Sequence, residues 1–185
     1  MTLALAAANA NAATIGAGNV EFTGTVIAQT CYVSSPTGDA TTVKIDMGTV
    51  TVSTVKTSTT AAPIFSGSAS EGATFTVHCE NKDATEVNLQ FQAPGSQLTD
   101  SNKVLRVNNG NPSGGYAQNV GIAVYPMGSL TAYDLATGKL LTAAQSVGAG
   151  GGTFELSFRA AYVKGAGDPT AGIANATLPF ILTTD

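Results

Sequence analysis

Both ends of this chain read as β-strands, and this feature most constrains how the chain can fold. Near the N-terminus, residues 20–26 (VEFTGTV) alternate apolar or small residues with polar ones, as half-buried strands do. At the C-terminus, residues 178–185 (LPFILTTD) form a second strand-like segment that continues to the last residue. Chain termini are usually polar and frayed, so we expect these ends to be edges that pair with other strands, including strands of another chain.

The composition is typical of an exported protein built from strands. The chain has 185 residues, enough for one domain with a core, and it is rich in Gly, Thr, Ser, Val and Ala. Its net charge of −4 argues against nucleic acid as a partner and provides no basic patch for a membrane surface. No apolar stretch reaches the roughly 18 residues that span a bilayer, so we expect no membrane insertion.

The first residues resemble the back half of a secretory signal peptide. Residues 3–8 (LALAAA) are a short apolar stretch, and residues 10–12 (ANA) form a small-x-small cleavage pattern before Ala13. The basic segment that normally precedes them is missing. We therefore expect residues 1–12 to be the remnant of a signal peptide; the alternative is a flexible arm that is never cleaved.

Two cysteines, Cys31 and Cys79, follow or end strand-like segments. An even count in an exported chain predicts a disulfide bond, which would stabilise the fold by about 3–4 kcal/mol in the chain-entropy model; the alternative is two buried free thiols. His78 is the single histidine, and no cysteine has a CxxC partner. The sequence therefore predicts no metal site, no cofactor, no Ser-His-Asp arrangement and no enzymatic activity.

Short strands separated by turn residues follow one another along the chain. The alternation of Phe154, Leu156 and Phe158, like that of Val87 and Leu89, places apolar side chains on one face. Regular spacing of this kind predicts an all-β sandwich with an immunoglobulin-like arrangement, and at most one helical turn within residues 130–141. The predicted strands are 20–27, 42–45, 49–55, 73–79, 86–92, 104–107, 120–125, 152–162 and 174–182.

Four stretches, taken in order and spacing, resemble a known family. They are residues 19–26 (NVEFTGTV); the two cysteines with the strand that ends at Cys79; residues 120–124 (VGIAV); and residues 158–162 (FRAAY) followed by 171–176 (AGIANA) and Phe180. Together they resemble the major pilin subunits of chaperone–usher fimbriae, such as type 1 and P pili. The family's C-terminal signature has a glycine fourteenth from the end, and Gly172 stands there. The family's penultimate tyrosine is replaced by Thr184, and Pro179 interrupts the last strand, so that one side of this strand is unpaired at that residue.

The resemblance implies an incomplete immunoglobulin-like sandwich that lacks its final strand. A neighbouring subunit would donate residues 13–26 as an N-terminal extension, and residues 27–185 would form the pilin domain with its acceptor groove. The implied donor residues are Val20, Phe22, Gly24 and Val26. The implied residues of the groove and C-terminal strand are Gly172, Leu178, Phe180 and Leu182.

The resemblance also implies partners and a location. The partners would be identical subunits in a filament, a periplasmic chaperone and an outer-membrane usher, and the protein would reach a fimbrium on the bacterial cell surface through the periplasm. It would act in adhesion as a structural subunit. The residues alone leave two alternatives open: residues 20–26 are the first strand of a self-contained sandwich, or the chain is a secreted or fimbrial-tip domain that binds carbohydrate. A secreted hydrolase is disfavoured by the absent catalytic residues.

Overall fold

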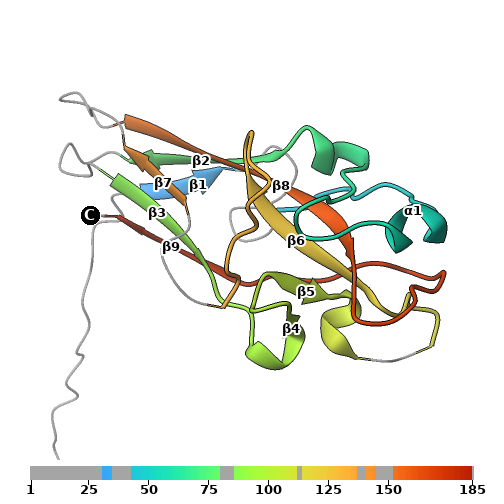
Figure 1. Ribbon diagram of the computed structural model, residues 1–185. Helices are drawn as coiled ribbons and strands as arrows, with labels where there is room; N and C mark the ends of the chain where they lie inside the picture. The colour runs from blue at the N-terminus through green and yellow to red at the C-terminus, as the bar shows by residue number, and fades with distance from the viewer. Residues whose placement is uncertain are drawn as a thin grey trace, which may run out of the picture.

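The computed structural model describes residues 31–34, 43–79, 86–111, 114–136, 141–144 and 152–184, which form two antiparallel β-sheets (Figure 1). The larger sheet has the strand order β1-β2-β8-β6-β5-β4, and the smaller has the order β7-β3-β9. This arrangement confirms the predicted all-β, immunoglobulin-like fold. The strands are β1 (Cys31–Ser34), β2 (Ala73–Cys79), β3 (Glu86–Phe91), β4 (Leu98–Thr99), β5 (Val104–Arg106), β6 (Val120–Pro126), β7 (Leu141–Ala144), β8 (Gly152–Lys164) and β9 (Phe180–Thr184). The helical elements are α1 (Val52–Lys56) and the 3-10 turns η1 (Gly67–Ser70), η2 (Gly95–Gln97) and η3 (Val107–Gly110).

The hydrophobic core lies between the two sheets. Phe154, Leu156 and Phe158 of β8 are buried against β3, as their alternation predicts. Phe91 of β3 meets Phe158 edge to face, with ring centroids 5.6 Å apart. Aromatic pairs favour this geometry, so the two sheets are joined by directional as well as apolar contacts.

Cys31 and Cys79 form a disulfide bond, which confirms the prediction and excludes the free thiols. The two residues are direct partners in the register of β1 and β2. The bond therefore ties the first described residue of the chain to a strand of the larger sheet, at the end of the molecule where β8 begins.

The predicted strand over residues 49–55 is wrong, because residues 52–56 form α1. Thr51 caps this helix: its side chain accepts a hydrogen bond from the Thr54 N–H at 3.2 Å, and such caps favour a helical first turn. Val55 is the one buried residue of the helix. The predicted helical turn is absent over residues 130–136, and residues 137–140 lie outside the described part.

Of the helices within the described ranges, none is both long and apolar enough to cross a membrane.

The two ends of the molecule carry different elements. Figure 1 shows β1, β3, β7 and the end of β9 towards one end, called here the β1 end. It shows α1 and the loop between β8 and β9 at the other, called here the α1 end.

Candidate functional site

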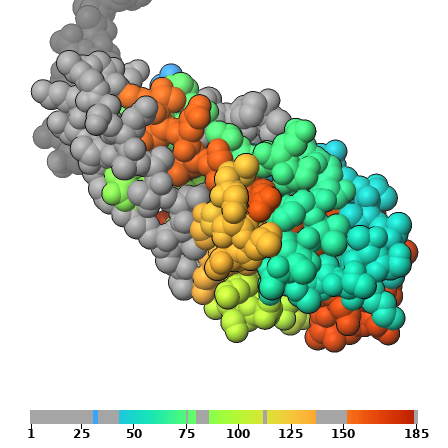
Figure 2. Space-filling view, turned by 45° about the horizontal axis from the view of Figure 1, so that its top comes forward, coloured from blue at the N-terminus to red at the C-terminus, as the bar shows by residue number. Residues whose placement is uncertain are grey.

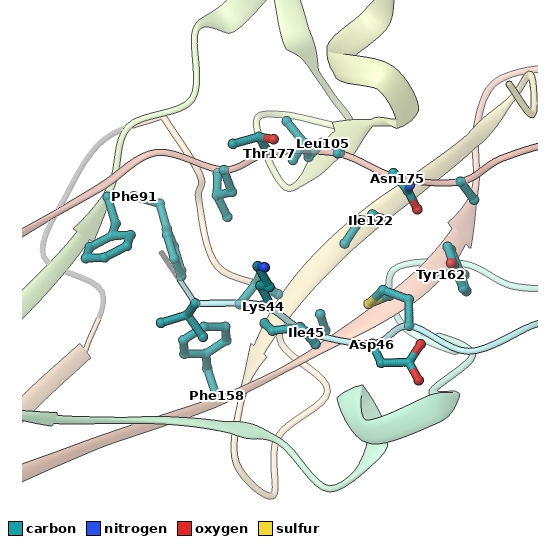
Figure 3. Close-up of a pocket in the computed structure, with 18 of the residues that line it drawn as sticks. Lys44, Ile45, Asp46, Phe91, Leu105, Ile122, Phe158, Tyr162, Asn175 and Thr177 are labelled. Atoms are coloured by element: carbon teal, nitrogen blue, oxygen red, sulfur yellow. The ribbon is translucent and has the colours of Figure 1, made fainter. Parts of the chain in front are cut away.

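A groove of about 880 Å³ lies between two extended segments, residues 43–48 and residues 174–180 (Figure 3). Neither segment belongs to a strand of either sheet except at Phe180, where β9 begins. The side chains at its floor come from β3, β5, β6 and β8 and are apolar apart from one tyrosine hydroxyl. They are Phe91, Leu105, Ile122, Val124, Phe158, Ala160 and Tyr162.

The two walls of the groove run in opposite directions. Val43 and Phe180 both pack on the core cluster that contains Phe158. Met47 and Ala174 both pack on the neighbouring cluster that contains Tyr162. One wall therefore begins where the other ends, and any strand placed between them would be parallel to one wall and antiparallel to the other.

The first wall is attached to the protein along one edge. The Asp46 N–H donates to Ser68 Oγ at 3.2 Å, and the Ala69 N–H donates to the Asp46 carbonyl at 3.0 Å. In an extended chain, successive residues point their backbone groups to opposite sides. The odd-numbered residues Val43, Ile45 and Met47 therefore turn theirs the other way, and the structure gives them no hydrogen-bond partner among the described residues.

The second wall shows the same alternation. The Asn108 N–H donates to the Asn175 carbonyl at 2.7 Å. Asn109 holds Thr177 twice: Nδ2 donates to its carbonyl at 2.7 Å, and Oδ1 accepts from its N–H at 3.0 Å. The intervening residues 174, 176 and 178 make no backbone hydrogen bond within the described part of the chain. Two edges whose groove-facing backbone groups have no partner among the described residues thus border one groove.

Pro179 affects the protein side of this wall and not the groove side. The Gln92 N–H donates to the Pro179 carbonyl at 2.8 Å, in line with the register in which Phe91 opposes Phe180. The proline nitrogen has no hydrogen to return to β3. At this residue the side that faces β3 therefore has one backbone hydrogen bond, through the carbonyl, and is only half paired.

Side chains alternate along both walls as they do in half-buried strands. Val43, Ile45 and Met47 are partly buried, whereas Lys44 and Asp46 between them are exposed. On the other wall Ala174, Ala176, Leu178 and Phe180 are partly buried, and the residues between them are exposed. The walls therefore have the pattern of sheet strands whose neighbour is missing.

The chemistry of the groove is apolar. Among the described residues that line it, Lys44 and Asp46 are the charged ones, and both are exposed. Burial, together with the nearby Asp46 carboxylate, raises the pKa of the Tyr162 hydroxyl, which therefore stays neutral at physiological pH. Over the described ranges, no three His, Cys, Asp or Glu side chains are grouped to bind a metal. His78 lies elsewhere, stacked on Tyr32 with ring centroids 5.0 Å apart.

Comparison with known proteins identifies the family. The sequence model of the family described as fimbrial protein matches residues 20–185. The chain is also 30% identical to a type-1 fimbrial protein subunit of Serratia marcescens, over 98% of this chain and 93% of that protein. The chain belongs to the fimbrial protein family. This pilin is therefore an exported subunit of a surface filament.

The pilin places the sequence-predicted site residues in different surroundings. Leu178 and Phe180 line the groove. Leu182 lies farther along β9, opposite Leu89, and packs on the core. Gly172 precedes the groove and lies against Tyr116 and Ala117, where a Cβ atom would collide with backbone. The predicted donor residues Val20, Phe22, Gly24 and Val26 lie outside the described residues.

Sequence reasoning missed how the walls are held. Asn108 and Asn109 directly follow the predicted strand 104–107, and both have positive φ values, of 51° and 52°. This left-handed backbone, which asparagine tolerates better than most residues, directs one backbone N–H and one side chain towards the second wall. The Asn-Asn-Gly sequence is the signal that could have found this turn, but it does not say which segment the turn contacts.

Proposed function

We propose that this chain is a non-enzymatic structural subunit of a fimbrial rod that polymerises by donor-strand exchange and supports adhesion. The observation that carries the proposal is the pair of unpaired, antiparallel edges that face an apolar groove. A strand inserted between them can form hydrogen bonds to both walls and place alternate side chains on the floor. We propose that residues 20–26 of a neighbouring subunit are that strand.

The dimensions of the two segments match. Residues 20–26 and residues 174–180 are equally long, and each spans about 20 Å when extended at about 3.3 Å per residue. Val20, Phe22 and Val26 share one face of the donated strand, with Gly24 as the small residue of that row. Each large side chain buried on the floor would contribute about 1.5–3 kcal/mol to the contact.

The position of the disulfide suggests the direction in which the donated strand runs. Cys31 fixes the root of the extension at the β1 end, and the chain from Val26 to Cys31 spans at most about 18 Å. The body of the donor therefore lies near the groove end that receives Val26. The extension of a subunit leaves from its β1 end, so the neighbour that accepts this extension lies at that end. The other neighbour, which donates a strand to this subunit's own groove, must therefore approach from the α1 end. In this arrangement the donated strand runs antiparallel to residues 174–180.

The remaining assignments follow from this mechanism and from the family resemblance. Residues 1–12 would be a signal-peptide remnant, residues 13–26 the donated extension, and residues 27–185 the pilin domain. A periplasmic chaperone would cover the groove before assembly, and an outer-membrane usher would catalyse the exchange. Thr184 in place of the family's tyrosine alters the last residues that the chaperone would contact.

Thermal unfolding of a chain that lacks residues 1–26 tests the proposal. A free peptide of residues 18–27 should raise the melting temperature, and more so at higher peptide concentration, because a ligand that binds only the folded state stabilises it. The matched control is the same peptide with Phe22→Asp, which should give little shift. A truncated chain that gains nothing from the peptide, or that polymerises normally without its extension, contradicts the proposal.

A further inference from the structure

Ile173 is an exposed apolar residue on a fixed backbone. The residue is 51% exposed, among the highest values for large apolar residues in the described part of the chain. Its N–H donates to the Gly115 carbonyl at 2.8 Å, and its own carbonyl accepts from the Ala117 N–H at 2.9 Å. The isoleucine is therefore held outward by hydrogen bonds on both of its backbone groups.

The loop that precedes Ile173 is attached to residues 117–119 along its length. The Gly165 N–H donates to the Asn119 carbonyl at 2.8 Å, and the Thr170 N–H donates to the Gln118 carbonyl at 3.0 Å. Gly172 lies so close to Ala117 that no side chain fits there. Surface loops are normally mobile, whereas residues 165–173, called here the platform, are held by these contacts, and a pre-organised surface loses little entropy when it binds.

This platform adjoins the groove. Ile173 directly precedes Ala174, the first residue of the second wall. Figure 2 shows α1 in teal and the loop before residue 173 in orange-red at one end of the molecule, and an ion pair of 3.3 Å between Lys56 and Asp168 joins the two. The α1 end thus combines a groove mouth with an exposed apolar side chain.

We infer that Ile173 and the platform beneath it form the docking surface for the body of the next subunit, at the mouth of the groove. The inference rests on the proposed donor-strand mechanism. A donor whose extension enters at the α1 end is tethered by residues 27–30, so Cys31 at its β1 end lies within about 18 Å of Val26 at this mouth. The occupant is therefore a second copy of this chain, and the side chain that it covers first is Ile173. The donated strand supplies one contact between subunits, and this surface supplies a second.

A pair of matched variants tests the docking surface in filament growth. Ile173→Asp should slow the elongation of preformed filaments by about tenfold, equivalent to about 1.4 kcal/mol in the docking step. The control is Leu130→Asp, at a side chain that is 53% exposed in the segment 126–136, which lies in the middle of one face in Figure 2. The control should elongate within twofold of the unmodified chain. Equal rates for the two variants overturn the inference.

Separate measurements distinguish this inference from the proposed function. The arm-deleted chain with Ile173→Asp should still be stabilised by the free peptide of residues 18–27, which shows that fold and groove are intact. Loss of that stabilisation in the variant alone would make Ile173 part of the groove and overturn the docking role. No stabilisation even without the substitution would instead contradict donor-strand exchange.

Photo-crosslinking reads the contact directly. With p-benzoylphenylalanine at position 173, assembled filaments should give an adduct between copies that maps to residues 27–34 of the neighbour. The same group at position 130 should give no adduct with that segment. Filaments that form but crosslink from position 173 to another surface, or not at all, overturn the inference.

Discussion

The paired strands β6 and β8, called here the closed side, and the two walls of the groove, called here the open side, are built from the same kind of sequence, yet only the first are paired along their length. β6 and β8 also supply part of the groove floor. β6 and β8 are paired continuously from Val120 opposite Lys164 to Pro126 opposite Phe158. Across the groove, residues 43–48 and 174–178 are equally extended and alternate in the same way, but no strand of the described residues lies between them. Alternation therefore specifies a strand, whereas the presence of a neighbour decides whether its edge is paired.

The open side is nevertheless well ordered on its outer edges. Asp46 bonds with Ser68 and Ala69, and Asn109 bonds with Thr177, so each wall is extended without a strand partner in the groove. Unpaired edges are ordinarily avoided because they recruit other chains. The proposed donor-strand exchange would use such recruitment for assembly.

The largest effect is expected from a substitution in the core behind the closed side, compared with one in the groove. Phe154, on β8, is 1% exposed, and Phe154→Asp would bury an unpaired charge at a cost of about 5 kcal/mol or more. We expect no folded subunit, measured by circular dichroism and by yield from the periplasm. Phe154→Leu should fold with a loss of about 1 kcal/mol. If the Phe154→Asp subunit folds and assembles, the core is required neither for folding nor for assembly.

The matching substitution on the open side should spare the fold and abolish assembly. Phe180 is only partly buried in the isolated subunit, so an aspartate there stays hydrated until a donated strand covers it. We expect Phe180→Asp to fold but to form no filaments by electron microscopy, and Phe180→Leu to assemble. Filaments of Phe180→Asp at the normal level would mean that Phe180 is not part of the acceptor wall.

A smaller effect is expected where the first wall meets the protein. Gly48 has a φ of +63°, and a Cβ atom there would lie 2.7 Å from the Gly67 nitrogen. Gly48→Ala should shift this wall, lower the free energy of unfolding by about 1–3 kcal/mol and weaken binding of the donor peptide. Gly114→Ala is the control, because nothing lies within 4 Å of a Cβ atom at that glycine. Unchanged peptide affinity in Gly48→Ala would show that this wall takes no part in binding.

The smallest effect concerns a tyrosine on the closed side. Burial, helped by the nearby Asp100 and opposed by Arg159, raises the pKa of Tyr125 to about 12. In the unfolded chain the Tyr125 hydroxyl titrates near pH 10, so the folded state binds this proton more tightly. The contribution of Tyr125 protonation to the free energy of unfolding is therefore full below pH 10 and is lost as the pH rises towards 12. Between pH 9 and 11, urea unfolding of Tyr125→Phe should depend less steeply on pH than that of the unmodified chain. An unchanged slope would contradict this linkage.

The sequence predicted the closed side well and the open side only in part. β2 and β8 begin where strict alternation of apolar and polar residues predicted, and the disulfide followed from an even cysteine count in an exported chain. Residues 174–182 were predicted as one strand, but only the residues from Phe180 onward belong to a strand, β9, because periodicity carries no information about neighbours. The α1 helix was missed because a capping threonine outweighed the valines around it. The wall contacts of Asn109 depend on tertiary placement, which no local pattern encodes.

Amide hydrogen exchange tests the central claim most directly, because it reads the unpaired backbone groups themselves. The amides of Ala174, Ala176 and Leu178 should exchange rapidly in a chain that lacks residues 1–26 and at least a hundredfold more slowly in assembled filaments, as hydrogen bonding to a donated strand protects them. Amides in the β6–β8 pairing should be slow in both. Equal exchange of Ala174, Ala176 and Leu178 in the two samples would contradict the insertion of a strand into this groove.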